Sequence, residues 1–238
     1  MTNSWDEPAG IAARGTVVVA AGRGETTDAY GRFGRRIAAD GYRVRALEDV
    51  SADVEASLAA AGKLLVDDSL PGPKVVVGSD TGALFALKLA ERAAPGLDAL
   101  ILAGLPVAPA GASPATIALP DWDAELEARS ACPAHRGVLG NGAATPGALF
   151  SAPIPTELIG DPGFRTPLPT LGLHGDADLV SPLETARGRY PGALVAITGG
   201  RHDVLNDVTH RTVAATIVLF LERLRLGADL PEIARVLS

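Results

Sequence analysis

Residues 73–83 read PKVVVGSDTGA, a short β-branched apolar run followed by a turn between two glycines. The run Lys74-Val75-Val76-Val77 has the composition of a strand buried on both faces of a parallel sheet. A sharp strand-to-helix turn needs small residues two positions before and two positions after its tip, so that the two backbones can pass closely. Gly78 and Gly82 supply these positions, which predicts Asp80 at the tip.

Ser79 is the alternative residue for the tip. Its flanking positions would then be Val77 and Thr81, which are both β-branched and too bulky for the turn. The spacing therefore favours Asp80, although this motif taken alone is also compatible with an ordinary turn that has no chemical role.

Strands and helices alternate on both sides of this turn. The predicted strands are residues 16–20, 42–46, 74–77, 99–103, 170–173 and 193–197. The predicted helices are residues 28–39, 54–66, 83–94, 124–131, 181–190 and 208–226. This alternation predicts an α/β fold with a mostly parallel central sheet and helices on both faces.

The alternation stops between residues 104 and 166, where prolines and glycines are frequent. This stretch is interpreted as a small lid inserted over the sheet. The predicted organisation is therefore a core formed by residues 14–103 and 167–238, a lid formed by residues 104–166, and an N-terminal extension of residues 1–13.

Composition excludes some classes of function. The net charge of −7 argues against nucleic acid as a partner, because phosphate binding needs a concentrated basic face. Arg32, Arg35 and Arg36 are interpreted as the solvated face of a helix. The single cysteine, a polar N-terminus and the lack of an apolar run of ~18 residues predict a cytoplasmic protein without a membrane insertion. The excess of Ala, Gly, Arg and Pro suggests a bacterial source.

Two further signals follow the turn in the chain. Asp178 lies on a loop after a predicted strand, where an acid can orient a histidine, with Asp176 as the alternative. His202 lies between the last predicted strand and the last helix. The order nucleophile, acid, histidine fits one known topology, which predicts a triad of Asp80, Asp178 and His202.

The loop Ala21-Gly22-Arg23-Gly24 follows the first predicted strand. In this position a loop can donate a backbone N–H to an oxyanion hole, and the second N–H would come from the residue after the nucleophile. Arg23 and Thr81 are the predicted donors. A dinucleotide loop is the alternative, but Thr27 stands where its third glycine would be.

The chain resembles the α/β-hydrolase superfamily over residues 14–238. The segment from Arg201 to Asp207, RHDVLND, looks like the histidine segment of monoacylglycerol lipases and lysophospholipases, which implies that His202 is catalytic. The Gly-x-Asp-x-Gly turn looks like that of epoxide hydrolases and haloalkane dehalogenases, whose aspartate attacks carbon, which implies the same role for Asp80. Thr81 departs from the Trp or Arg usual after that aspartate.

The lid is expected to shape a substrate pocket. The candidate pocket residues are Tyr30, Trp122, His135 and Phe150. Cys132 and His135 have a ligand-like spacing but no companion pair, so neither a metal site nor a cofactor is predicted.

Three functions remain open at this point. The first is a hydrolase that forms a covalent Asp80 ester with a small apolar substrate, as an epoxide hydrolase does. The second is a hydrolase of carboxylic esters, lactones or lysophospholipids. The third is a binding protein, cyclase or lyase on the same fold. Each of them implies a small-molecule partner, and the sequence does not predict an oligomeric state.

Overall fold

The computed structural model describes residues 3–107, 121–161 and 163–235. Its seven strands form one sheet, and they are β1 (Asn3–Trp5), β2 (Gly15–Ala20), β3 (Tyr42–Leu47), β4 (Lys74–Ser79), β5 (Ala99–Ala103), β6 (Thr170–Gly175) and β7 (Ala193–Ile197). The strand order is β1-β3-β2-β4-β5-β6-β7, so β4 is the central strand. All neighbours pair in parallel except β1, which is antiparallel to β3.

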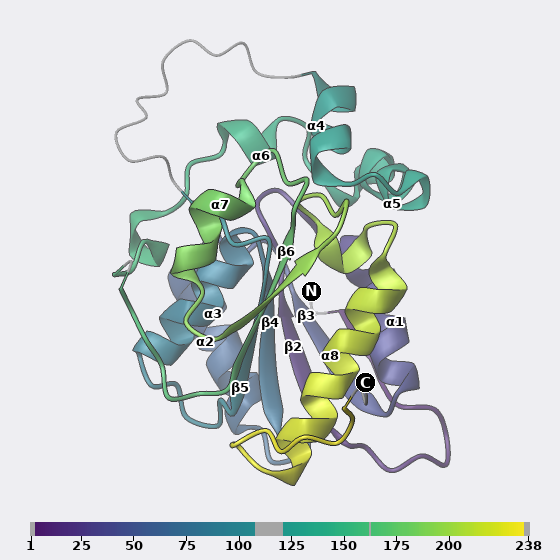
Figure 1. The fold of residues 1–238 in the computed structure, drawn as a ribbon, viewed down its shortest axis with the longest axis vertical. Coiled ribbons are helices and arrows are strands. Elements are labelled where there is room, and N and C mark those ends of the chain that lie inside the picture. The colour runs from purple at the N-terminus through teal and green to yellow at the C-terminus, as the bar shows by residue number, and fades with distance from the viewer. Residues whose placement is uncertain (1–2, 108–120, 162, 236–238) are drawn as a thin grey trace.

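Helices cover both faces of this sheet (Figure 1). The α-helices are α1 (Gly31–Ala39), α2 (Val54–Val66), α3 (Thr81–Glu91), α4 (Trp122–Arg129), α5 (Pro133–Val138), α6 (Ala148–Ser151), α7 (Leu183–Ala186) and α8 (His210–Leu226). Short 3-10 or irregular turns are η1 (Thr27–Tyr30), η2 (Leu139–Ala143), η3 (Thr156–Leu158), η4 (Arg187–Arg189) and η5 (Val204–Asn206).

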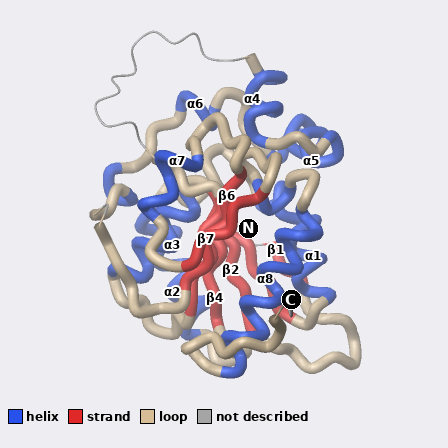
Figure 2. The backbone as a smooth tube through the Cα atoms, in the orientation of Figure 1, coloured by secondary structure: helices blue, strands red, loops and turns tan. Residues whose placement is uncertain are grey.

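The strands supply apolar side chains to two separate cores, because successive residues of a strand point to opposite faces. Val17, Val75 and Ile101 pack on one face with residues of α1 and α8. Val18, Val76 and Leu100 pack on the other face with residues of α2 and α3. Figure 2 shows this arrangement as a central group of strands between helices. The predicted fold class is therefore confirmed.

Several elements differ from the sequence-based expectation. The helix predicted over residues 28–39 is a 3-10 turn followed by α1, and the one predicted over 181–190 is the short α7 and η4. Strand β1 lies within the N-terminal segment, where no strand was expected. Residues 121–161 hold α4, α5, α6 and two turns, more helix than predicted. The helices α4, α5 and α6 lie above the carboxyl ends of the strands (Figure 1). Residues 108–120 and 162 of the expected lid lie outside the described residues.

Among the described residues, no helix combines the length and the hydropathy needed to cross a bilayer. The carboxyl ends of β2, β4, β6 and β7 all lie at one edge of the sheet, because these strands are parallel. Open α/β sheets bind their ligands at this edge. The loops that carry the candidate site residues start there.

Candidate active site

The turn after β4 has the geometry that its glycines predict. Asp80 has φ 50° and ψ −122°, a strained conformation for a residue with a side chain, and it lies directly before α3. A Cβ atom on Gly78 would be 2.0 Å from the carbonyl oxygen of Gly82, and one on Gly82 would be 2.1 Å from that of Ala20. Only glycine fits at either position, so the register of the turn places Asp80 at its tip.

The structure brings Asp80, His202 and Asp178 together. His202 Nδ1 lies 2.8 Å from Asp178 Oδ2, and His202 Nε2 lies 3.3 Å from Asp80 Oδ1. All three are buried: Asp80 is 2% exposed, His202 is 0% exposed and Asp178 is 3% exposed. Loops after β4, β6 and β7 supply one residue each, so the parallel sheet holds the three side chains at one edge.

Asp178 has further partners that fix its carboxylate. Its Oδ1 accepts hydrogen bonds from the N–H groups of Val180 and Ser181. His174 Nε2 lies 3.2 Å from Asp178 Oδ2 and 2.6 Å from the carbonyl oxygen of Ser181, so this nitrogen is a donor. The alternative acid Asp176 instead accepts a hydrogen bond from the backbone of Gly199.

Arg23 contacts Asp80 through both its backbone and its side chain. The backbone N–H of Arg23 donates to Asp80 Oδ2 at 3.0 Å. The guanidinium group donates to the same oxygen through Nε at 2.8 Å and to Oδ1 through Nη2 at 2.9 Å. Bidentate pairs of this kind are among the strongest side-chain hydrogen bonds. The sequence predicts the backbone donor, whereas the ion pair was not expected.

Thr81 occupies the first position of α3 and is fully buried. Within the described part of the chain its N–H donates no hydrogen bond to Asp80, unlike that of Arg23. Its hydroxyl oxygen Oγ1 is buried without a partner there. The second predicted oxyanion donor is thus next to Asp80 in the chain but is not bonded to its carboxylate.

The charges of this group balance. Burial acts to raise the pKa of Asp80, but the charge of Arg23 and hydrogen bonds from His202 and Arg23 hold it well below its usual range. Burial acts to lower the pKa of His202, but Asp178 and Asp80 together raise it to about 10. At neutral pH the site therefore holds two carboxylates, one imidazolium and one guanidinium.

A second buried network supports the loop that carries Arg23. Glu25 Oε2 contacts the hydroxyl of Tyr30 and accepts a hydrogen bond from the N–H of Gly22, which Tyr30 Oη also contacts. Arg129 of α4, which is fully buried, donates to Glu25 Oε1 at 3.0 Å and to the carbonyl oxygen of Arg23 at 3.1 Å.

Burial and the nearby charge of Asp203 raise the pKa of Glu25 to about 8, whereas Arg129 acts in the opposite direction. Arg129 also contacts Glu125 Oε1 at 3.1 Å. Arg129 and Glu25 were not predicted, because both stand among other polar and charged residues and no pattern in the sequence marks them as buried.

The predicted pocket residues lie in different surroundings. Tyr30 points under the Gly22 loop, as described above. Trp122 packs against the core at the start of α4, and Phe150 on α6 is 37% exposed. His135 is buried on α5, where its Nε2 lies 3.3 Å from Asp203 Oδ2.

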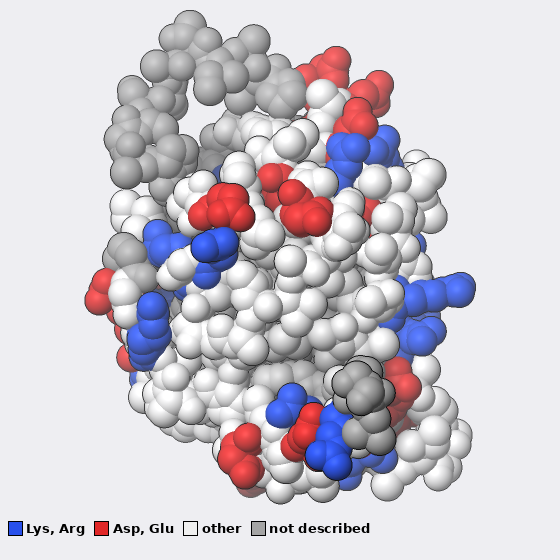
Figure 3. All heavy atoms as spheres, in the orientation of Figure 1, with Lys and Arg blue, Asp and Glu red and all other residues white. Residues whose placement is uncertain are grey.

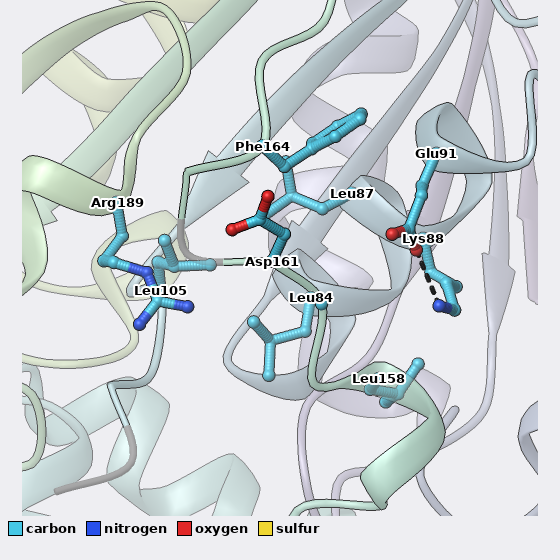
Figure 4. Close-up of a pocket in the computed structure, with 10 residues that line it drawn as sticks. Leu84, Leu87, Lys88, Glu91, Leu105, Leu158, Asp161, Phe164 and Arg189 are labelled. Carbon is cyan, nitrogen blue, oxygen red and sulfur yellow. Dashed lines mark hydrogen bonds and ion pairs between the residues drawn. The ribbon is translucent and has the colours of Figure 1, made fainter. Parts of the chain in front are cut away.

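Figure 4 shows a hollow over α3, lined among others by Leu84, Leu105, Asp161 and Arg189. Its volume of ≈ 30 Å³ is about that of one water molecule. Asp80, Asp178 and His202 do not line it. Asp80, Asp178 and His202 are all buried. In the described part of the chain, no group of three His, Cys, Asp or Glu side chains is arranged to hold a metal ion.

Comparison with solved structures shows what the chain is similar to. A monoacylglycerol lipase from Paleococcus ferrophilus matches with a TM-score of 0.70 and 16% identity, over 93% of this chain and 97% of that chain. An esterase from Exiguobacterium antarcticum matches with a TM-score of 0.66 and 17% identity, over 93% and 94%. A meta-cleavage product hydrolase from Pseudomonas fluorescens, an S103A variant, matches with 0.67 and 16%, over 94% of each chain.

No family model and no curated protein matches the sequence. The structural matches cover nearly the whole of both chains, and at these identities they establish the fold. The chain has the α/β-hydrolase fold, and the predicted resemblance to that superfamily is confirmed at the level of fold.

Proposed function

We propose that the chain is a hydrolase that acts on a small apolar epoxide through a covalent Asp80 ester. The observation that supports this most directly is the contact between the backbone N–H of Arg23 and Asp80 Oδ2, at 3.0 Å. In a serine esterase this donor stabilises an oxygen of the substrate. Here it stabilises an oxygen of the aspartate itself, which is needed when water attacks the carbonyl carbon of an aspartyl ester.

In the first step, Asp80 Oδ1 attacks a carbon of the epoxide. A C–O bond forms, the ring C–O bond breaks, and its electron pair goes to the leaving oxygen. The protonated His202 transfers its proton to the leaving oxygen of the epoxide. Its Nε2 lies 3.3 Å from Asp80 Oδ1, next to the place of attack. A halide would leave without taking a proton, and so the pKa of His202 favours an epoxide over an alkyl halide.

In the second step, the neutral His202 accepts a proton from water, and the hydroxide attacks the Asp80 carbonyl carbon. The negative charge develops on Oδ2, against the Arg23 N–H. The intermediate releases the product alcohol with the proton from His202, and the acid of Asp80 returns its own proton to His202. Asp178, 2.8 Å from His202 Nδ1, orients the ring throughout.

The ion pair with Arg23 has to open before this attack. Each oxygen of Asp80 has two hydrogen-bond partners, and one of the two is the guanidinium group. Both lone pairs of each oxygen are therefore engaged, and none is available to a carbon atom until the guanidinium group leaves. The remaining contact of the guanidinium group, from Nη1 to the carbonyl oxygen of Ala152, is long at 3.3 Å. Once released, Arg23 can stabilise the developing charge on the leaving oxygen.

Hydrolysis of carboxylic esters is a second candidate. It is favoured by the names of the matched structures, which include a monoacylglycerol lipase and an esterase, and by the lipase-like segment around His202. Attack of Asp80 on an ester would give a mixed anhydride, which is less common in enzymes than an acyl serine.

A binding protein or a lyase without a covalent intermediate is a third candidate. The ion pair of Asp80 and Arg23 favours it, since a carboxylate with two engaged oxygens is suited to hold charge in place and poorly suited to attack.

A single turnover in heavy-oxygen water separates these candidates. The protein is mixed in excess with styrene oxide, and the peptide that contains Asp80 is analysed by mass spectrometry. We expect one heavy oxygen in the Asp80 carboxylate after formation of the diol. Turnover without label in this peptide would contradict a covalent Asp80 ester, and the Asp80→Asn variant gives the background.

The Asp80→Ser variant tests the ester hydrolase candidate. It keeps His202, Asp178 and the backbone donor of Arg23. A gain of activity on 4-nitrophenyl butyrate shows that this machinery supports acyl transfer once a hydroxyl is present. If the native chain hydrolyses this ester faster than styrene oxide, the second candidate replaces the first.

A further inference from the structure

A cavity of ≈ 450 Å³ lies between β1, α1 and α5. Asp80, Asp178 and His202 do not line it, so it is distinct from the candidate active site. Small-molecule sites in proteins usually have ~300–1,000 Å³, so this cavity is large enough for a metabolite. Its polar lining includes Arg32, Arg35, His135 and Asp28.

The cavity carries positive charge on a chain whose net charge is −7. Arg32 uses part of its guanidinium group to contact the carbonyl oxygen of Asn206 and Cys132 Sγ. Arg35 is exposed, and no described residue pairs with it. The carboxylate of Asp28 is the one acidic group in the lining, and it accepts a hydrogen bond from the side chain of Asn3.

Further basic residues lie near the start of α8. Burial lowers the pKa of His210, and the nearby charges of Arg32, Arg211 and Arg36 lower it further. Basic side chains project from the edge of the molecule along which α1 runs (Figures 1 and 3). A concentration of one sign of charge in a hollow attracts ligands of the opposite sign.

Two ring side chains complete the lining. Trp5 of β1 is partly buried and packs closely over Gly34 of α1. His135 is buried and uses Nε2 in its contact with Asp203, while none of the described residues bonds its Nδ1. The lining therefore combines two arginines, one histidine and one tryptophan.

We propose that this cavity is a binding site for a small aromatic anion, either a carboxylate or a phosphate monoester. The planar guanidinium groups of Arg32 and Arg35 match the oxygens of such a group, and Trp5 packs against its ring. The three arginines at positions 32, 35 and 36 are thus not equivalent. Arg32 and Arg35 line the cavity and Arg36 does not, although Arg35 and Arg36 are both exposed as expected of a solvated helix face.

The test uses Arg35→Ala and Arg36→Ala, which remove the same charge from adjacent exposed positions of α1. Only Arg35 lines the cavity, and neither residue pairs with another among those described, so both variants are expected to fold. Phenyl phosphate, benzoate and the uncharged benzyl alcohol are titrated by calorimetry up to about 10 mM. Trp5 fluorescence in a Trp122→Phe background reports whether the ligand reaches this cavity, since the chain has two tryptophans.

We expect saturable binding of phenyl phosphate or benzoate with a change in Trp5 fluorescence. Arg35→Ala should weaken it about tenfold or more, and Arg36→Ala by less than about threefold. The ratio of the two affinities shows whether the site prefers phosphate or carboxylate. Equal losses in both variants, equal binding of benzyl alcohol, binding without a Trp5 signal, or no binding of either anion would each overturn the proposal.

Discussion

At the scale of single residues, Arg23 is the residue that contacts both carboxylate oxygens of Asp80. Its guanidinium group satisfies both carboxylate oxygens, and its backbone N–H donates to one of them. The backbone donor remains in every substitution except proline, whereas the guanidinium group is lost. The two contributions of this residue can therefore be separated by experiment.

Arg23→Met removes the ion pair and keeps the N–H. We expect Asp80 to be alkylated by styrene oxide about tenfold faster or more, because its lone pairs are released. Intact-mass spectrometry after short reaction times measures the rate, with Arg36→Met as a control for the loss of charge. Slower alkylation in Arg23→Met would mean that the guanidinium group assists the attack more than it blocks it.

Asp80→Asn should lower the pKa of His202 from about 10, because one of the two carboxylates that hold its proton is lost. The shift can be measured by NMR titration of the histidine rings, of which the chain has four. Asp176→Asn serves as the control, since Asp176 contacts the backbone of Gly199 and not His202. An unchanged His202 pKa in Asp80→Asn would contradict the charge balance described for the site.

The sequence predicted Asp80 at the tip because the glycine spacing depends only on local geometry. It did not predict the ion pair with Arg23 or the contact between Arg129 and Glu25. Both contacts depend on the direction in which a long buried arginine side chain points. The partner that sets this direction is 57 positions away in the sequence for Arg23 and 104 positions away for Arg129.

At the scale of elements, the join between β4 and α3 is set by close backbone contacts. The Cβ position on Gly82 is 2.1 Å from the carbonyl oxygen of Ala20, on the neighbouring strand. Because that atom belongs to the backbone of a central strand, it cannot move aside without disturbing the sheet.

Gly82→Ala should therefore destabilise the chain by more than about 3 kcal/mol. Gly62→Ala is the matched control, because Gly62 lies within α2 and a Cβ there would meet nothing within 4 Å. We expect this control to stabilise the chain by roughly 0.5–1 kcal/mol, since alanine is the better helix former. Urea unfolding measures both values, and similar results for the two variants would contradict the tight fit at the turn.

The segment above the sheet was the least predictable set of elements. A single helix over residues 124–131 was expected, and α4 is in fact Trp122–Arg129, followed by α5 and α6. These short helices lack a long apolar period and depend on tertiary contacts. Glu125, for example, accepts hydrogen bonds from the N–H groups of Gly147 and Leu149 at the start of α6.

At the scale of the whole molecule, the charge of His202 links stability to pH. Its pKa in the folded chain is about 10, above the value of ~6.5 expected when unfolded. The folded state therefore holds this proton more tightly. The resulting stabilisation is complete below about pH 6.5 and is lost as the pH rises towards 10.

Asp178→Asn should flatten this dependence, because it removes the carboxylate closest to the ring. We expect the native chain to lose roughly 2 kcal/mol or more between pH 6 and pH 9, and the variant to lose less. Urea unfolding at the two pH values gives both differences. A variant with the full pH dependence of the native chain would show that other groups cause it.

The global fold was predictable because strands and helices alternate in the sequence, which limits the possible sheets. The closure of the site was not. Whether Asp80 is exposed or covered depends on how loops after β2 and helices above the sheet pack together, and this packing leaves no periodic pattern in the sequence.

Arg129 has a consequence for how a substrate can enter. Arg129 lies at the end of α4, where its guanidinium group contacts Glu125 of the same helix. The same group donates to Glu25 and to the Arg23 carbonyl oxygen, and so it connects α4 to the loop after β2. A hinge motion that lifted α4 would take the Arg129 donor away from Glu25 and from the carbonyl oxygen of Arg23, and each buried acceptor left without a partner costs about 1–3 kcal/mol. We therefore expect α4 to stay in place when a ligand enters. Individual side chains would rotate and open a narrow passage to Asp80.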